Sequence, residues 1–249
     1  VTVVYKPVIN GVTRMISLYK ECLQDMGHEV TIFTLGDPDP DGEEANVIRS
    51  PAIPVGDYGY QIGVRYSREA REQMRMMDIL HCHHLMFSVD LAHRYGRCPV
   101  VLTNHTRHDL YASAYLPLPQ QAADVLVRQV WPEYTGMADT VIAPSESVRD
   151  IMLQFGVSQP IEIIHNGVDL HLFYEPKVPR SKSDLGIHDS ALLAVYTGRL
   201  SAEKNLDVLL EQFAIAVDIV PELHLLLVGH GPATEDLQYQ ARKLGLEDR

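Results

Sequence analysis

Cysteine is scarce in this chain, and the few cysteines follow no pattern of metal binding or disulfide pairing. The three cysteines are Cys22, Cys82 and Cys98, and no two of them form a CxxC pair. An odd number of widely spaced cysteines argues against a disulfide framework and against a zinc knuckle. We therefore expect reduced thiols and a cytoplasmic protein.

Basic residues and long apolar runs are also too few for several protein classes. The chain has 21 Lys and Arg against 33 Asp and Glu, a net charge of −12. This balance argues against a general nucleic-acid binder, which needs a basic face to displace phosphate counterions. No apolar run reaches the roughly 18 residues that indicate a transmembrane helix. The chain opens on VTVVY without a basic n-region or an initiator Met, so we expect no signal peptide and a few residues missing in front.

The sequence does have a regular alternation of apolar runs and helical patterns. Short apolar runs that alternate with longer helical patterns predict βαβ units and a parallel sheet, the α/β class. The runs expected as strands are Val1–Tyr5, Val30–Thr34, Ile79–Cys82, Pro99–Thr103, Thr140–Ala143, Ile161–Ile164, Leu192–Thr197 and Leu223–Val228. The expected helices are Thr13–Met26, Ser67–Met77, Phe87–Tyr95, Gln121–Met137, Ser145–Phe155, Leu206–Ile219 and Thr234–Leu244.

A change in composition divides the chain into two expected domains. Residues 1–168 form the first, and the alternation restarts over residues 189–249. Residues 169–188 between them, which include EPKVPRSKSD, read as a linker because they are rich in Pro, Ser and charge. Two strands and two helices would leave an apolar sheet edge unpaired, so we expect the second domain to be incomplete.

Polar motifs follow the expected strands of the first domain, where open α/β sheets bind their ligands. Asn10-Gly11 in KPVINGV offers close backbone approach and a helix N-terminus, although a tight βα turn is the more common explanation. The loop TNHTRHDLY holds His105, whose ring is suited to orient a sugar hydroxyl or stabilise a developing charge. The alternative is a loop whose polar groups satisfy each other. The preceding HCHH, residues 81–84, permits a metal site, although packed imidazoles are the more common explanation.

Later strand ends carry a helix cap and two further motifs. Ser145 in APS reads as a helix cap, and HNGVD contains Asn166 in a glycine turn. In TGRLSAEKN, Gly198 is followed by Arg199 and by Lys204 near a helix N-terminus. Two cations at the positive end of a helix are unfavourable without an anion, so this motif predicts a diphosphate site. Gly229 opens a second glycine-rich turn, GHGP, on the same edge.

Taken together, these motifs resemble retaining glycosyltransferase family 4, whose members have two Rossmann-like domains, the GT-B fold. The matching segments run in the family's order over essentially the whole chain. They are YKPVINGV, GHEV, HCHH, TNHT, ADTVIAPSESV, IHNGVD, VYTGRLSAEKNLDVLLEQF, LLLVGHGP and LGLEDR. The resemblance implies two parallel-sheet domains, of which the second is truncated here.

The resemblance also implies roles for particular residues. It implies transfer of a hexose from a UDP- or GDP-linked sugar with retention of anomeric configuration, and no cofactor or metal. His105 would contact the transferred sugar, while Arg199 and Lys204 would hold the diphosphate in place of a metal ion. Donor contacts are further expected from Gly11, Gly198 and Gly229. Candidates for the acceptor are Asn10, Arg107, Asp109 and Asn166.

One element of the family is not found where it belongs. The family's Glu-x7-Glu motif lies late in the second domain, whereas Glu21…Glu29 and Glu203…Glu211 have that spacing in the wrong places. We expect the true motif beyond Arg249, and therefore an inactive fragment. A nucleotide-sugar epimerase of the same architecture and a sugar- or nucleotide-binding module without catalysis stay open. A flavodoxin-like signalling domain is disfavoured, because Lys6-Pro7 stands where it would carry paired acidic residues.

The acceptor is either a sugar or a lipid. Arg65, Arg68, Arg71 and Arg75 lie at spacings that place them near one face of the expected helix Ser67–Met77, beside Met74, Met76 and Met77. Such a stripe is suited to anionic lipid headgroups, which would make the protein peripherally membrane-associated. The alternative is a solvated face of ion pairs.

Overall fold

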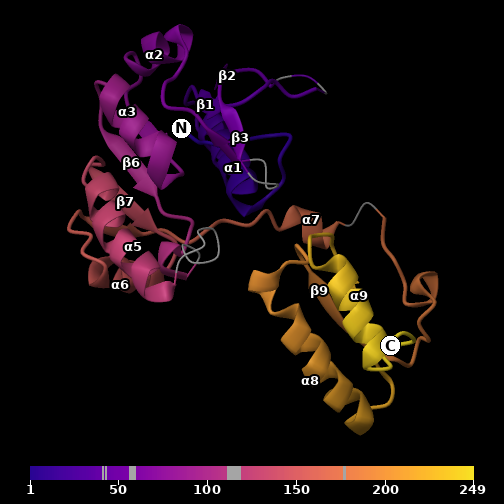
Figure 1. Ribbon diagram of the computed structural model, residues 1–249. Coiled ribbons are helices and arrows are strands. Elements are labelled where there is room, and N and C mark those ends of the chain that lie inside the picture. The colour runs from indigo at the N-terminus through magenta and orange to yellow at the C-terminus, as the bar shows by residue number, and fades with distance from the viewer. Residues whose placement is uncertain (41, 43, 56–59, 111–118, 176–177) are drawn as a thin grey trace. The chain divides into compact units, whose positions relative to one another are not determined.

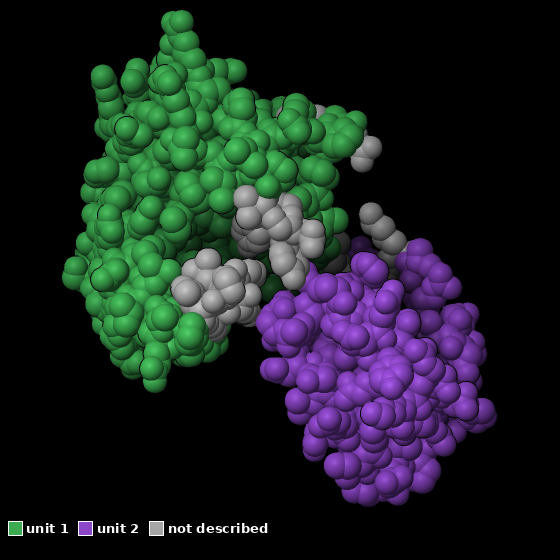
Figure 2. Space-filling view, in the orientation of Figure 1, with its two compact units in different colours: residues 1–170 green, residues 171–249 purple. Residues whose placement is uncertain are grey.

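The computed structural model describes residues 1–249 except 41, 43, 56–59, 111–118 and 176–177. The chain divides into two compact units, Val1–Leu170 and His171–Arg249 (Figure 2). No helix in the described ranges is both long and apolar enough to cross a membrane.

The first unit is built on a parallel sheet. Its four strands lie in the order β5-β6-β7-β8, and all neighbours are parallel. A second parallel pair joins β1 to β2. The bounds are β1 Ile32–Leu35, β2 Val47–Ser50, β5 Leu80–Cys82, β6 Val100–Thr103, β7 Thr140–Ala143 and β8 Ile161–Ile163. The α/β class with parallel sheets is thereby confirmed.

The opening segment Val1–Tyr5 is not a regular strand, so that prediction is wrong in detail. The segment nevertheless bridges the two sheets, because Thr2 N donates to Phe33 O of β1 and His83 N donates to Val1 O. Thr2 Oγ1 donates to Val4 O at 2.8 Å, and Val3 N donates to His84 Nδ1 at 3.4 Å. These side-chain hydrogen bonds take backbone groups that a regular strand would use to pair with its neighbours.

Helices cover the sheets of the first unit (Figure 1). They are α1 Gly11–Asp25, α2 Arg68–Met74, α3 Asp90–Tyr95, α5 Gln120–Thr135 and α6 Glu146–Gln154. A kinked segment, Leu85–Val89, precedes α3, and its Met86 and Phe87 have non-helical dihedral angles. The expected helix Ser67–Met77 is shorter than predicted, so Arg65 lies before it and Arg75 caps it. The helix predicted over Phe87–Tyr95 begins at Asp90 instead, because Phe87 has a left-handed φ of +57° that a regular helix does not allow. The hairpin of β3 (Ile53–Val55) and β4 (Tyr60–Ile62) was not predicted, since its strands are short and prolines interrupt the pattern.

The second unit holds a two-stranded parallel sheet in its described residues. Strand β9 (Leu192–Thr197) pairs with β10 (Leu223–Val228), and the helices are α8 (Leu206–Ile219), α9 (Thr234–Lys243) and the short α7 (His171–Tyr174). Two 3-10 turns lie at Ser183–Leu185 and Ala202–Lys204. Residues 171–188, most of the expected linker, fall within this unit. Its core residues are Leu200, Leu206, Leu210, Phe213, Leu237 and Leu246.

Two glycines let the loop after β10 lie against the loop after β9. A Cβ on Gly229 would stand 1.8 Å from Gly198 O, and one on Gly231 would stand 2.2 Å from Leu200 O. Backbone bonds hold the contact, since Gly198 N donates to Val228 O and Leu200 N donates to His230 O. Gly229 therefore has a packing role in the unit itself.

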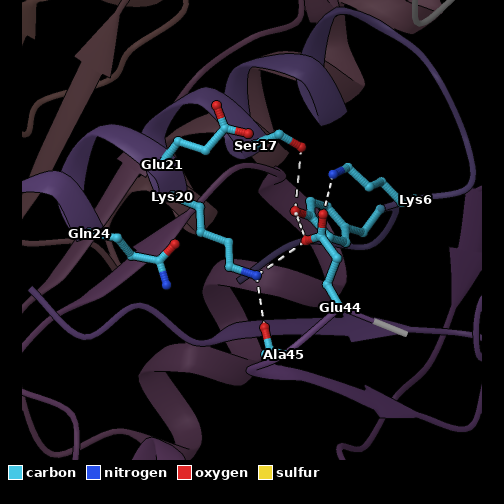
Figure 3. A pocket seen from close by; sticks show the side chains of 8 residues that line it. Lys6, Ser17, Lys20, Glu21, Gln24, Glu44 and Ala45 are labelled. Carbon is cyan, nitrogen blue, oxygen red and sulfur yellow. Dashed lines mark hydrogen bonds and ion pairs between the residues drawn. The ribbon is translucent and has the colours of Figure 1, made fainter. Parts of the chain in front are cut away.

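An ion cluster fixes the start of the loop that leads into α1. Lys20 Nζ donates to Glu44 Oε2 at 3.2 Å and to Ala45 O at 2.8 Å, and Lys6 also pairs with Glu44. Tyr5 Oη donates to the same carboxylate at 3.0 Å. Figure 3 shows both lysines directed at Glu44. Burial alone would raise the pKa of Glu44, but these donors outweigh it and lower the pKa to about 2.

We predict that Gly229→Ala destabilises the second unit by about 1–3 kcal/mol, the usual cost of overpacking. The physical reason is the backbone clash with Gly198, which no side-chain rotation relieves. Hydrogen exchange of the amides in α8, α9 and β10 measures the effect. Gly11→Ala is the control, because nothing lies within 4 Å of a Cβ there. Equal protection in the Gly229 variant and wild type would refute the packing role.

We predict that Glu44→Gln lowers the stability of the first unit at neutral pH by roughly 1 kcal/mol, since the carboxylate is partly exposed and screened. The folded-state pKa lies below the ordinary 4.5, so the carboxylate stabilises fully above pH 4.5, and that contribution disappears as the pH falls towards 2. Urea unfolding of both proteins across this range should show the difference shrinking. Glu72→Gln, which breaks an exposed pair with Arg68, should matter less. A difference that stays constant with pH contradicts the assignment.

Candidate functional site

The motifs singled out in the first unit lie where parallel strands end. His83 and His84 follow β5, residues 104–109 follow β6, Ser145 follows β7, and residues 165–166 follow β8. The strands are parallel, so these ends meet at one edge of the sheet, the usual position for ligands. Ser145 caps α6, as expected, by accepting a hydrogen bond from Val148 N.

His105 belongs to a stack of aromatic rings at this edge. Its Nε2 shares a hydrogen bond with Nδ1 of His83 at 3.0 Å, and the two rings stack with centroids 5.3 Å apart. The His81 ring lies 4.3 Å from that of His83, and its Nε2 shares a hydrogen bond with Thr103 Oγ1 at 2.7 Å. Tyr19 of α1 stacks on His81 at 5.8 Å. We call His81, His83, His105 and Tyr19 the histidine stack.

The imidazoles of the histidine stack are uncharged at neutral pH. Burial lowers the pKa of His105 to about 4 and that of His81 to about 3, and it holds the pKa of His83 well below its ordinary value. Neighbouring imidazoles add to the effect on His83. Within the described ranges, no group of His, Cys, Asp and Glu side chains has an arrangement that would hold a metal ion. The stack can therefore offer neutral hydrogen-bond donors and acceptors, the groups that suit sugar hydroxyls.

Asn10 and Gly11 start α1. The Asn10 side chain accepts from Val12 N and Thr13 N, and Thr13 Oγ1 accepts from Asn10 N, which completes a capping box. Gly11 is the first helical residue, and a Cβ there would meet nothing within 4 Å. The described residues around Gly11 therefore leave room for a side chain at this position.

The other residues predicted to bind the acceptor differ in whether their side chains are already bonded within the protein. Arg107 forms a two-pronged ion pair with the buried Asp109 at 2.6 and 2.8 Å, so these groups satisfy each other. Burial alone would raise the pKa of Asp109, but the Arg107 bonds and backbone donors lower it. Asn166 is exposed, in a loop whose Gly167 lies beside Leu18 of α1. Tyr111, the last residue of TNHTRHDLY, lies outside the described residues.

The second unit carries the cationic motif. Arg199 is half-buried and follows Gly198 directly after β9, while Lys204 is exposed and ends the 3-10 turn Ala202–Lys204. Helix α8 begins two residues later, so its free N–H groups lie close to Lys204 in the chain. Glu203 is bonded to Ser201 Oγ at 2.6 Å. Arg199 and Lys204 thus place two cations near the helix start, where an anion is favourable, and the acidic Glu203 and Asp207 lie beside them in the chain.

Sequence reasoning missed the cavity beside α1. Its volume is about 250 Å³. The cavity is lined by Tyr5, Lys6, Ser17, Lys20, Glu21, Gln24, Glu44 and Ala45 (Figure 3). One signal was available: Lys20 follows the buried Ile16 by four residues, so it lies on the inward face of α1. A lysine at a buried position requires an anionic partner, which is Glu44.

Two family models match the chain in succession. The model described as Glycosyltransferase Family 4 matches residues 9–172, and the one described as Glycosyl transferases group 1 matches residues 178–249. The chain is 30% identical, over 98% of its length, to an alpha-monoglucosyldiacylglycerol synthase of Streptococcus pneumoniae. It is 28% identical, over 92% of its length, to the enzyme of that name from Acholeplasma laidlawii. It spans 58% and 62% of these two relatives.

Solved structures support the fold. The whole chain superposes on HepE of Anabaena in complex with UDP-glucose, with a TM-score of 0.68 at 17% identity, and covers 66% of that protein. It superposes equally completely on sucrose-phosphate synthase of Thermosynechococcus elongatus, with a TM-score of 0.65 at 18% identity and the same 66% coverage. With these folds and a family model that matches most of its length, the chain belongs to glycosyltransferase family 4 and has the GT-B fold.

Proposed function

We propose that the whole protein is a glycolipid synthase that transfers glucose from UDP-glucose to diacylglycerol. The observation that carries this proposal is the 30% identity, over 98% of the chain, to a protein named alpha-monoglucosyldiacylglycerol synthase. HepE, which shares the fold, was solved with UDP-glucose. The names of the two synthases favour transfer over epimerisation or mere binding.

In the proposed reaction, cations stabilise the leaving group. The bond between the anomeric carbon and the β-phosphate oxygen breaks, and a bond to the acceptor oxygen forms. The acceptor proton passes to the departing phosphate. Arg199 and Lys204 would neutralise the charge that develops on the diphosphate, in the role that a metal ion has elsewhere. Retention of configuration is part of the proposal, because the names of the relatives denote an α-linked product and UDP-glucose is itself α-linked.

His105 would act on the transferred sugar. Its pKa of about 4 keeps the ring neutral, so it is suited to hydrogen-bond a sugar hydroxyl and not to hold a phosphate. The Gly11 loop would approach the donor or acceptor with its backbone, which explains a glycine where the chain has room for a side chain.

A lipid acceptor requires contact with a membrane, at its cytoplasmic face in this proposal. Arg65, Arg68 and Arg75 are exposed around α2, and the nearby Val64 and Met76 are 73% and 72% exposed. Arg68 is paired with Glu72 at 2.7 Å, an exposed bond that headgroup phosphates can replace. Arg71 instead packs over the Tyr95 ring. Exposed cations beside apolar side chains fit the interface of an anionic bilayer.

We predict that Arg199→Ala and Lys204→Ala each lower turnover of the full-length protein by about 10²–10³, the usual cost of losing one charge-stabilising donor. The measurement is transfer of labelled glucose from UDP-glucose to diacylglycerol. Arg242→Ala is the matched control, because it removes an exposed cation from the last turn of α9. Turnover within twofold of wild type in both test variants would remove the motif from the mechanism.

We predict that the protein binds vesicles containing anionic lipid and that binding falls with salt. Replacing Arg65, Arg68 and Arg75 by Gln should weaken binding roughly 100-fold, since each arginine near the surface contributes about 1 kcal/mol. Co-sedimentation measures it. The control replaces Arg14, Arg180 and Arg242, three exposed arginines elsewhere, with the same change in net charge. An equal loss of vesicle binding in both triple variants, or no binding at low salt, would contradict membrane contact through the α2 surface and indicate a solvated face.

A further inference from the structure

His83 is the residue that engages His105 within the histidine stack. Its Nδ1 lies 3.0 Å from His105 Nε2. His83 is itself held firmly: it is 6% exposed, it packs 4.3 Å from the His81 ring, and Tyr19 lies 6.0 Å away. His81 is in turn bonded to Thr103. A chain of contacts from α1 and β6 therefore ends at His105.

The hydrogen bond between two neutral imidazoles constrains both rings. A neutral imidazole carries one N–H and one lone pair, so one ring donates and the other accepts. If His105 changed tautomer alone, two N–H groups or two lone pairs would face each other. Because Nε2 of His105 is engaged by His83, Nδ1 remains for another partner, and its protonation is the complement of that at Nε2.

We propose that His83 is a positioning residue whose hydrogen bond holds the ring orientation of His105 and couples its tautomer to that of His83, so that His83 sets which group a sugar oxygen meets at Nδ1. The proposal rests on the proposed function, in which His105 contacts the transferred sugar. A fixed tautomer matters because a hydroxyl can accept from N–H or donate to a lone pair, but each needs a different geometry. His83 thus acts through His105 and not on the substrate.

The side-chain nitrogen NMR spectrum of the 249-residue chain tests the positioning role without any activity. In wild type, His105 should show a single neutral tautomer. His83→Phe keeps the stacking ring but removes the nitrogen, so His105 should become a mixture of tautomers. His83→Gln is the second variant, in case His83→Phe does not fold. The glutamine amide lies near the former position of Nε2, so the hydrogen bond that Nδ1 makes to His105 is lost. His84→Asn, which changes the next histidine without touching this bond, should leave His105 unchanged.

Turnover of the full-length protein links the constraint to function. His83→Phe and His83→Gln should lower kcat about 10-fold while KM for UDP-glucose changes little, the signature of misplaced chemistry. His83→Asn restores a hydrogen-bonding group near Nδ1 and should recover most of the loss. A mixed tautomer in wild type, or one unchanged tautomer in both His83→Phe and His83→Gln, overturns the positioning role. A changed tautomer with unchanged kcat supports positioning and refutes the catalytic role of His105.

Discussion

Parallel pairing of β5, β6, β7 and β8 is the constraint on which the rest of the first unit depends. Parallel strands need a return crossover after each strand, so every turn that follows a strand lies at one edge of the sheet. Residues 22 positions apart, such as His83 and His105, become hydrogen-bonded neighbours because β5 and β6 pair directly. Single motifs that are weak in the sequence thereby converge in space.

The two units offer opposite kinds of chemistry. In the first, burial keeps the pKa values of His81 and His105 at about 3 and 4, so the edge of the sheet presents neutral hydrogen-bonding groups. In the second, Arg199 and Lys204 bring two cations to a helix N-terminus, beside Glu203 and Asp207. A nucleotide sugar has both a neutral, hydroxyl-rich part and a charged diphosphate. The proposed division of roles follows from this match between chemical character and environment.

Elements could be predicted from the sequence where the interactions that determine them are local in the chain, and not where they depend on tertiary contacts. Strand β9, helix α8 and strand β10 have the predicted bounds, because their periodicity and end signals are local. Val1–Tyr5 was misjudged because Thr2 and His84 side chains take backbone partners, a tertiary effect. The Lys20–Glu44 pair joins segments that no periodicity relates. Gly229, expected at the donor, has a packing reason visible only once two loops touch. His105 was singled out from the sequence, but its hydrogen bond with His83 is seen only in the structure.

The central claim is that Arg199 holds the diphosphate while His105 contacts only the sugar. Calorimetric titration of the full-length protein with UDP, which lacks the sugar, tests it most directly. Arg199→Ala should weaken UDP binding about 10–100-fold, as expected for a lost hydrogen bond to a charged group. His105→Ala should leave UDP affinity within about twofold of wild type, because it removes no contact to the nucleotide. An equal loss in both variants, or an unchanged affinity in Arg199→Ala, would contradict this account.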